Sequence, residues 1–380
     1  MGAAAHARAD QEKRRPPGVG VKRHGRWKRT LAGVVGSFAL AFCAVGAYVV
    51  FPGEPGKAST LTFDGFIKLP GTGPLAALDY LTISRDQLFV SSISSGQVLA
   101  TSLPALHVQA SATVRSSEPG GSAHGVVLVD DPPVGLVTRG GTNTVDLFDP
   151  TTLQTLKRLK VAKGPDAILR DPETGLVYVA SGEARMASLI DPLQRRVVAT
   201  IALPGQPEYA AQDERTGLLY QNLADTNSVA VISFVRRAVV DHWPLARCQR
   251  PSGMALDALH QRLFVVCSGN SRLGVIDIAS HAEIASLPIG RLSDTAAYDP
   301  LLQRLYVAGG MGQLTVVVPV GTHAYRVVDR VRTHLGAHTL VIDPASHRLY
   351  VGYAGFLGAP RVAVFSPRES TLQQVTTEPK

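Results

Sequence analysis

Seven polar side chains occupy matching places in an internal repeat, and together they could bind a ligand or a metal ion. Six of them stand 12 residues before the central residue of an apolar-aromatic-Val motif that recurs along the chain. The first stands 10 residues before it, because the turn in the first repeat is two residues shorter than in the others. The seven residues are Asp79, His124, Asp166, Glu208, Ser252, Asp294 and His338. Carboxylates and imidazoles coordinate divalent metals and exchange protons near neutral pH. If the repeats surround one axis, these side chains meet at one rim of the central channel.

The set with the clearest metal-binding chemistry comprises His338, Asp79 and His124. These residues belong to the seventh, first and second repeats, which become neighbours when a ring closes. Two imidazoles and a carboxylate suit a divalent transition metal, and a bound ion could polarise a carbonyl group or activate water. The sequence also allows a structural interpretation, because a polar residue that begins a strand often bonds to backbone N–H groups or faces channel water.

The repeat that places these residues is marked by an apolar-aromatic-Val motif after a turn. Its clear copies are Leu88-Phe89-Val90, Val177-Tyr178-Val179, Leu263-Phe264-Val265, Leu305-Tyr306-Val307 and Leu349-Tyr350-Val351. Two weaker copies carry Leu136 in place of the aromatic residue and Gln221 in place of Val. From Tyr178 onward the spacing is 42 to 44 residues. A period of about 40–45 residues is typical of a β-propeller blade.

Each repeat predicts a four-stranded antiparallel meander. A short apolar strand ends in an acidic turn such as Asp171-Pro172 or Asp299-Pro300, the motif follows as the second strand, and two further strands complete the unit. Proline after Asp favours a turn and cannot continue a strand ladder. We therefore predict an all-β fold, a seven-bladed β-propeller over residues 61–367, in which the innermost strands line the axis.

The two ends of the propeller predict how the ring closes. Ile67-Lys68-Leu69-Pro70-Gly71 is similar to Ile201-Ala202-Leu203-Pro204-Gly205, which ends the outer strand of a repeat. Residues 62–69 therefore form an outer strand ahead of the first full repeat, and the last repeat shows only three clear strands. We expect the early strand to complete the seventh blade, which leaves no open sheet edge. The alternative is that Leu372–Val375 supplies the missing strand.

Several phrases of the repeat identify a family resemblance. LVYVASG, RLYVAGG, RLYVGYA and LGVIDIAS resemble the YVTN-type β-propeller repeats of exported bacterial and archaeal surface proteins. The resemblance covers residues 62–366 and implies the propeller fold. It leaves the activity open, because relatives include the haem-binding propeller of cytochrome-type nitrite reductases, metal-dependent lactonases and lyases, and binding proteins without enzymatic activity.

The N-terminal segment predicts targeting to a membrane. Residues 31–51 form 21 residues without a charge, which is enough to span a bilayer as a helix. The basic leader at residues 1–30 predicts a cytoplasmic N-terminus, so the propeller would lie in the periplasm or outside the cell. The alternative is a signal peptide, cleaved near Val45-Gly46-Ala47 to release a secreted protein. Residues 52–60 are expected to be a linker, and residues 368–380 a polar tail.

The charge distribution argues against nucleic acid as a partner. The net charge is +8, but residues 1–30 hold nine Lys or Arg against two acids. The other 350 residues carry 29 basic and 28 acidic side chains, so the propeller is nearly neutral. Nucleic-acid binding needs clustered Lys and Arg to neutralise phosphates.

Three cysteines and three missing motifs narrow the chemistry further. Cys248 and Cys267 are predicted to form a disulfide, because a hairpin in the fifth repeat brings their segments together. Cys43 lies in the apolar N-terminal run. The sequence contains no Cys-x-x-Cys pair, no phosphate-binding glycine loop between a strand and a helix, and no Gly-x-Ser-x-Gly motif.

Two functions fit these observations. The first is a membrane-anchored binding or scaffold propeller that holds a small ligand or a cation, such as a divalent metal ion, at its axial mouth. The second is a metal-dependent enzyme of the lactonase or lyase type, with Asp166, Glu208 or Asp294 as general base. A haem-binding relative would use His124 or His338 as an axial ligand, but no further sequence feature favours it.

Overall fold

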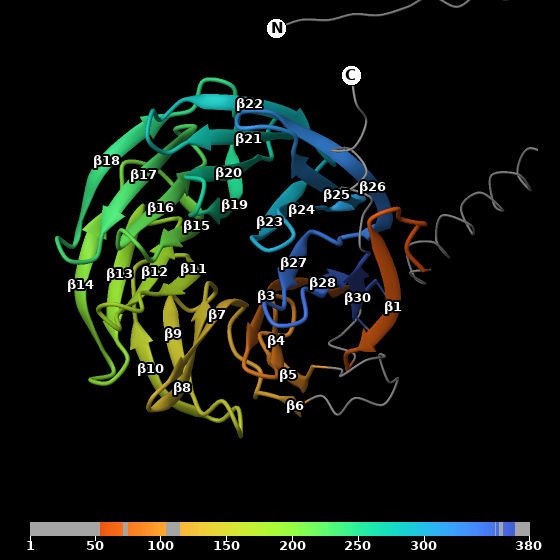
Figure 1. The fold of residues 1–380 in the computed structure, drawn as a ribbon. Helices are drawn as coiled ribbons and strands as arrows, with labels where there is room; N and C mark the ends of the chain where they lie inside the picture. The colour runs from red at the N-terminus through yellow and green to blue at the C-terminus, as the bar shows by residue number, and fades with distance from the viewer. Residues whose placement is uncertain (1–53, 71–74, 104–114, 354, 357–359, 369–380) are drawn as a thin grey trace, which may run out of the picture. The chain divides into compact units, whose positions relative to one another are not determined.

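Seven four-stranded antiparallel sheets follow one another around a ring in the computed structural model (Figure 1). The structure describes residues 54–70, 75–103, 115–353, 355–356 and 360–368. Each sheet is one blade of a β-propeller, and in six of the seven blades the strands run in sequence order from the axis to the rim. The predicted all-β, seven-bladed fold is confirmed.

The first three blades are built as follows. Blade one contains β3 (Leu78–Ser84), β4 (Gln87–Ser92), β5 (Val98–Ser102) and β6 (Arg115–Ser116). Blade two contains β7 (Ala123–Asp130), β8 (Pro133–Arg139), β9 (Thr144–Phe148) and β10 (Thr155–Lys160). Blade three contains β11 (Pro165–Arg170), β12 (Val177–Ser181), β13 (Met186–Asp191) and β14 (Arg196–Ala202).

The next three blades repeat the pattern. Blade four contains β15 (Pro207–Asp213), β16 (Leu218–Leu223), β17 (Ser228–Ser233) and β18 (Ala238–Pro244). Blade five contains β19 (Pro251–Asp257), β20 (Arg262–Cys267), β21 (Arg272–Asp277) and β22 (Glu283–Pro288). Blade six contains β23 (Ser293–Asp299), β24 (Arg304–Gly309), β25 (Met311–Pro319) and β26 (Tyr325–Leu335).

Blade seven joins the two ends of the propeller. It contains β27 (Thr339–Ile342), β28 (Leu349–Tyr353), β30 (Arg361–Pro367) and β1 (Leu61–Lys68), in that order from the axis. Strand β1 pairs antiparallel with β30, from Leu61 opposite Pro367 to Lys68 opposite Arg361. The early strand therefore closes the ring, as predicted. The alternative segment, Leu372–Val375, lies outside the described residues. The segment that leads from β1 to blade one also pairs with the last part of the chain, through β2 (Leu75–Ala76) and β29 (Gly355–Phe356).

The hydrophobic core lies between neighbouring blades, because successive side chains of a strand point to opposite faces of its sheet. In β12, Val177 and Val179 pack against blade two, whereas Tyr178 packs against blade four. All three are fully buried. The apolar-aromatic-Val motif is thus the central strand of a blade that is covered on both faces.

The two weak copies of the motif have structural explanations. Gln221, in place of Val, is fully buried and accepts a hydrogen bond from the hydroxyl of Tyr178 at 2.9 Å. Its amide nitrogen donates to the carbonyl oxygens of Glu208 and Tyr209. Beside Leu136, Gly135 leaves room for the ring of Phe148, which a Cβ at that position would approach to 2.2 Å. An aromatic ring from the third strand therefore fills the space in blade two.

The predicted disulfide is present. Strand β19 begins opposite the end of β20, and Pro251 pairs with Cys267. The sulfur atoms of Cys248 and Cys267 are bonded, and both residues are buried in the cluster between blades four and five.

The predicted membrane-spanning segment at residues 31–51 and the basic leader lie outside the described residues. Within the part of the chain that the structure describes, no helix is long and apolar enough to cross a membrane. The end of the predicted linker contacts the propeller, because the side chain of Asp329 in β26 accepts hydrogen bonds from the backbone and hydroxyl groups of Ser59 and Thr60.

Candidate metal site at the axial mouth

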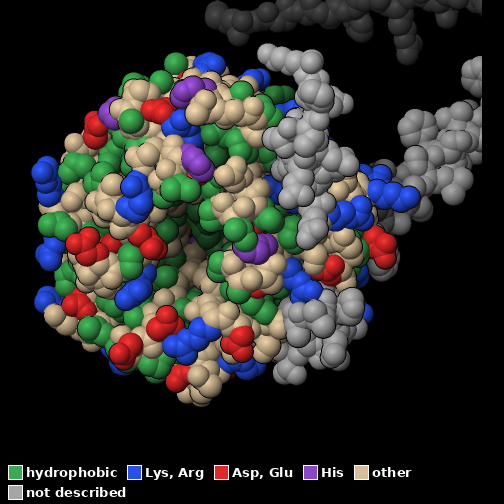
Figure 2. Space-filling view, viewed as in Figure 1, with side chains coloured by type: hydrophobic (Ala, Val, Ile, Leu, Met, Phe, Trp, Pro, Cys, Tyr) green, Lys and Arg blue, Asp and Glu red, His purple; other side chains and the backbone are tan. Residues whose placement is uncertain are grey.

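The seven residues singled out from the sequence lie at equivalent places around the axis. Six are the second residue of an innermost strand, and His338 directly precedes β27. The innermost strands contact one another in a closed series, from β3 through β7, β11, β15, β19, β23 and β27 back to β3. We call these seven residues the axial ring. The face of the molecule is hollowed at the centre of the blades (Figure 2).

A β-bulge accompanies the axial ring in six blades. In blade three, Pro165 pairs with Ser181, but Ile168 pairs with Val179, so one extra residue is inserted on the inner strand next to Asp166. Equivalent register shifts occur in blades one, two, four, five and six. A bulge re-aims side chains and interrupts regular pairing, which is why bulges are common beside functional sites.

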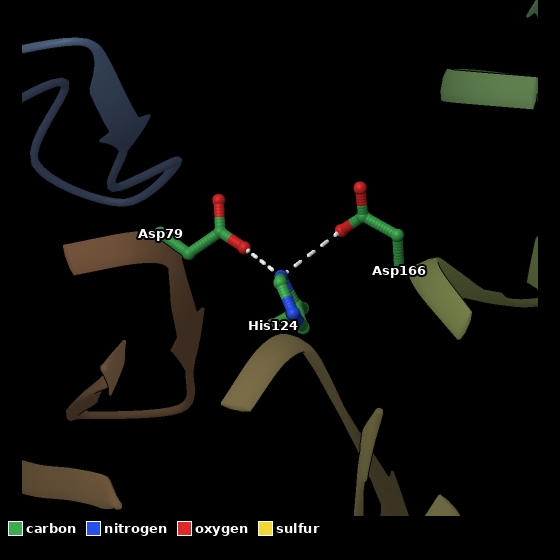
Figure 3. Close-up of side chains that lie close together, drawn as sticks. All are labelled: Asp79, His124 and Asp166. Atoms are coloured by element: carbon green, nitrogen blue, oxygen red, sulfur yellow. Dashed lines mark hydrogen bonds and ion pairs between the residues drawn. The ribbon is translucent and has the colours of Figure 1, made fainter. Parts of the chain in front are cut away.

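Three members of the ring converge on one point (Figure 3). Nδ1 of His124 lies 2.5 Å from Oδ2 of Asp79 and 3.6 Å from Oδ1 of Asp166. The three ligand atoms all lie within 4.8 Å of one another. His124 and Asp79 are largely buried, and the side chain of Asp166 is 36% exposed. We call Asp79, His124 and Asp166 the axial triad.

The axial triad differs from the predicted set of His338, Asp79 and His124. Nδ1 of His338 lies 3.5 Å from Oδ2 of Asp294, its neighbour in blade six. Asp166 reaches His124 from the other side, because blade three is the next blade after blade two. The structure therefore places Asp79 and His124 together as expected, brings Asp166 to them, and pairs His338 with Asp294.

The crowded carboxylates at the mouth are held in an unfavourable environment. Burial, followed by the charge of Asp79, raises the pKa of Asp166 to about 8. Burial and the charge of Asp294 raise the pKa of Glu208 to about 7. Burial alone would lower the pKa of His124, but its hydrogen bond to Asp79 and the nearby negative charges outweigh this effect and raise it. Both effects show that the mouth favours additional positive charge.

Backbone contacts fix the two acids with raised pKa values. Thr138 in β8 donates its hydroxyl hydrogen to the carbonyl oxygen of Asp166 at 2.6 Å. Gln221 holds the carbonyl oxygen of Glu208 in the same way at 2.8 Å. Oδ1 of Asp166, by contrast, is shielded from solvent and has no hydrogen-bond partner. Burying a polar oxygen without a partner costs free energy, so this atom is available for a ligand.

A small polar cavity lies inside the mouth. It has a volume of about 30 Å³, which is room for one or two water molecules or an ion. Its walls include Asp79, Asp166, Glu208 and Asp294. Tyr80 of blade one and Tyr209 of blade four also line the cavity, and they stack across the axis with ring centroids 5.4 Å apart. Sequence analysis missed this pair, although each Tyr follows a ring residue directly.

Two serines near the mouth, Ser252 of the axial ring and Ser122, differ in what their hydroxyl groups contact. Ser252 lines the small cavity, but its hydroxyl group lies 3.4 Å from the carbonyl oxygen of Ser293 and 3.5 Å from that of Val266, so it binds backbone. Ser122, which the sequence analysis did not select, lies 3.1 Å from Nε2 of His124. The spacing of Ser122 and His124 is two residues at the start of a strand, which places both side chains on one face. That spacing was the available signal.

The comparisons with known proteins support the fold and leave the family open. No protein-family model matches the chain. No curated protein matches it either. Solved structures match at low sequence identity. Hydrazine synthase from Kuenenia stuttgartiensis is 18% identical with a TM-score of 0.63, over 78% of this chain and 97% of that one.

Two other solved structures match this chain with nearly the same TM-score. A catalytically inactive variant of virginiamycin B lyase from Staphylococcus aureus, determined with quinupristin, is 10% identical with a TM-score of 0.63, over 80% of this chain and 99% of that one. The WD40 β-propeller domain of Doa1 is 12% identical with a TM-score of 0.64, over 82% of this chain and 98% of that one. These proteins share the propeller fold and differ in function, so the fold alone does not assign an activity.

Proposed function

We propose that this chain is an exported, membrane-anchored propeller of the YVTN type that binds a divalent metal ion at its axial mouth. The axial triad supplies the ligands: Nδ1 of His124 and one carboxylate oxygen each from Asp79 and Asp166. Mixed imidazole and carboxylate donors suit zinc, manganese and related ions. The repeat phrases, the basic leader and the apolar run at residues 31–51 support the exported, anchored location.

The observation that carries the metal proposal is the unpartnered oxygen of Asp166. Oδ1 is buried, lacks a hydrogen bond, and lies 3.6 Å from the imidazole nitrogen that already contacts Asp79. Among the described residues, it is the one buried carboxylate oxygen without a hydrogen bond. A divalent ion would give the oxygen a partner and would offset the negative charge that raises the pKa values of Asp166 and Glu208.

Binding requires a small rearrangement. The 2.5 Å contact between His124 and Asp79 is a hydrogen bond. Two tetrahedral ligands about 2.1 Å from one ion lie about 3.4 Å apart, so the ring and the carboxylate must separate by about 1 Å. The proton between them must leave, because a metal ligand has to be deprotonated. Ion binding should therefore release protons and weaken as the pH falls.

Calorimetric titration of the purified full-length chain with Zn²⁺ and Mn²⁺ tests the proposal. We expect one ion per chain, and at least a tenfold weaker affinity in His124→Ala and Asp166→Asn. His347→Ala is the matched control, because His347 also contacts an aspartate through Nδ1 but lies away from the axial ring. Equal binding by all four proteins, or no binding by the wild type, would refute the proposal.

A metal-dependent enzyme of the lactonase or lyase type is the second candidate function. The pKa of Glu208, raised to about 7, favours it, because a general base is most effective when its pKa is near the working pH. Glu208 lines the same cavity as Asp79 and Asp166. The ion would polarise the substrate carbonyl, and Glu208 would accept a proton. Glu208→Gln should then keep the ion and lose turnover of cyclic esters, whereas retained turnover would remove Glu208 from this role.

A further inference from the structure

We propose that Ser122, His124 and Asp79 form a nucleophilic serine relay that transfers small acyl groups when no ion occupies the axial mouth. The relay goes beyond the metal-binding function and shares His124 and Asp79 with it, and only its expected suppression by an ion rests on that function. Hydroxyl, imidazole and carboxylate groups in this order are the arrangement that activates a serine in unrelated hydrolase folds.

The relay is complete in the structure. Oγ of Ser122 lies 3.1 Å from Nε2 of His124. Nδ1 of the same ring lies 2.5 Å from Oδ2 of Asp79. When Nδ1 carries the ring proton and donates it to Asp79, Nε2 is free to accept the proton of Ser122. Asp79 thus orients the ring and stabilises the imidazolium that forms.

Two glycines from blade two complete the surroundings of Ser122. The backbone N–H of Gly141 donates to Oγ of Ser122 at 3.0 Å, so this hydroxyl group is held in a fixed position beside His124. A Cβ on Gly140 would lie 2.7 Å from Nε2 of His124 and 3.3 Å from Oγ of Ser122. The contact between serine and histidine therefore depends on a glycine at this position.

Ser122 lines a second pocket, which shares Asp166 and Glu208 with the small axial cavity. The pocket has a volume of about 390 Å³ and is lined by both Ser122 and His124. Asp166, Glu183 and Glu208 also line it. Glu183 is paired with Lys163 at 2.8 Å, and Asp166 lies 3.6 Å from His124. The size and the acids favour a small neutral or cationic acyl group over an anionic one.

The reaction needs only an ester and water. Oγ of Ser122 bonds to the carbonyl carbon while its proton passes to Nε2 of His124. The bond to the alcohol oxygen then breaks, and the proton on Nε2 passes to the leaving alcohol. Water attacks the acyl-serine and gives a proton to Nε2, and Oγ leaves with that proton, so the products are an alcohol and a carboxylic acid.

Ion binding and the serine relay exclude each other. An ion on Nδ1 forces the proton of the neutral ring onto Nε2, which can then no longer accept a proton from Ser122. The same imidazole therefore serves either the ion or the serine. A bound ion should switch the nucleophile off.

Covalent labelling with a fluorophosphonate probe tests the relay. The full-length chain is treated with chelator, labelled, digested and analysed by mass spectrometry. We expect the adduct on Ser122, and at least a tenfold lower labelling rate in His124→Ala and Gly140→Ala. Saturating Zn²⁺ should suppress the adduct to a similar degree.

Two controls guard against loss of folding and non-specific reaction. Ser228 contacts Nε2 of His242 at 2.8 Å but is 1% exposed, so it should stay unlabelled and Ser228→Ala should change nothing. Gly321→Ala adds a Cβ with no atom within 4 Å and controls for Gly140→Ala. No adduct on Ser122 in the ion-free wild type, or equal labelling in His124→Ala, would overturn the relay. Either result would leave the calorimetric test of ion binding unaffected.

Discussion

Contacts between histidine and aspartate occur in two regions of this propeller, and their surroundings differ. At the axial mouth, Nδ1 of His124 lies 2.5 Å from Asp79. Away from the mouth, Nδ1 of His260 lies 2.7 Å from Asp257, and Nδ1 of His347 lies 2.9 Å from Asp299. We call the latter two the peripheral pairs. The residue types and distances are similar, so the contact itself does not identify a functional site.

The peripheral pairs are satisfied by the fold. Asp299 is 1% exposed, and its Oδ1 accepts hydrogen bonds from the backbone N–H groups of Leu301 and Leu302. Asp257 accepts bonds from the hydroxyl of Tyr298 and the backbone N–H of His260. Carboxylates of this kind tie a turn to its blade and to the next blade.

The axial mouth lacks this satisfaction. Oδ1 of Asp166 has no hydrogen-bond partner, and the pKa values of Asp166 and Glu208 are raised by burial and by neighbouring acids. The proposed ion site therefore rests on an unpartnered carboxylate oxygen and on acids with raised pKa values, rather than on a histidine beside an aspartate.

Removing a peripheral carboxylate should give the largest loss of stability. Asp299→Ala leaves His347 and two backbone N–H groups without their acceptor, so we expect the free energy of unfolding to fall by about 3 kcal/mol. Urea unfolding measures this, and the affinity for Zn²⁺ should not change. Asp149→Ala is the matched control, since Asp149 accepts the same turn bonds at the surface and should matter much less. A loss of ion binding in Asp299→Ala would contradict the assignment of a purely structural role to the peripheral pairs.

The axial mouth should make the ion-free protein less stable as the pH rises. The pKa of Asp166, about 8, and that of Glu208, about 7, lie above their ordinary values of 3.8 and 4.5. The folded chain therefore keeps protons that the unfolded chain releases, and stability falls between about pH 4 and pH 8.

The histidines act in the same direction. The pKa values of His124 and His338 are raised from 6.5 by their aspartate partners against the opposing effect of burial, so their contribution is present at low pH and is lost as the pH rises through the folded-state value. Unfolding of the chelated protein from pH 4.5 to 8.5 should show a loss of about 1–2 kcal/mol. The double variant Asp166→Asn, Glu208→Gln should show a flatter profile. An unchanged slope would contradict the charge account of the mouth.

Neutralising Asp166 alone should have the smallest effect on stability. Whether the variant is more or less stable than the wild type is the informative result. Without an ion at pH 8, Asp166→Asn should be more stable than the wild type by about 1 kcal/mol, a value kept low because the side chain is about a third exposed and screened by water. With saturating Zn²⁺ the order should reverse, because the variant lacks a ligand. Thermal unfolding with and without the ion measures both differences. A destabilised variant without the ion would assign Asp166 a structural role.

Much of this architecture could be predicted from the sequence. The spacing of the apolar-aromatic-Val motif sets seven blades, the similarity of residues 67–71 to 201–205 predicts ring closure, and counting back from the motif finds the axial ring. These features could be predicted because they depend on the spacing of residues along the chain, and each blade repeats the same pattern of strands and turns.

The composition of the site was harder to predict because it depends on contacts between blades. The count placed Asp166 in the ring but could not show that its carboxylate turns toward His124 while His338 turns toward Asp294. A bulge accompanies six of the seven ring residues, and the residue spacing does not reveal it. Ser122 was missed for a related reason, since its relation to His124 depends on the missing side chain of Gly140.

The most direct test of the account is the position of an ion in crystals of the protein grown with Mn²⁺ or Zn²⁺. Anomalous scattering at the absorption edge of the metal locates it without assumptions about ligands. We predict one strong peak about 2.0–2.3 Å from Nδ1 of His124 and from carboxylate oxygens of Asp79 and Asp166. A map with no peak at the axial mouth, or with its peak at His260 or His347 instead, would contradict the account.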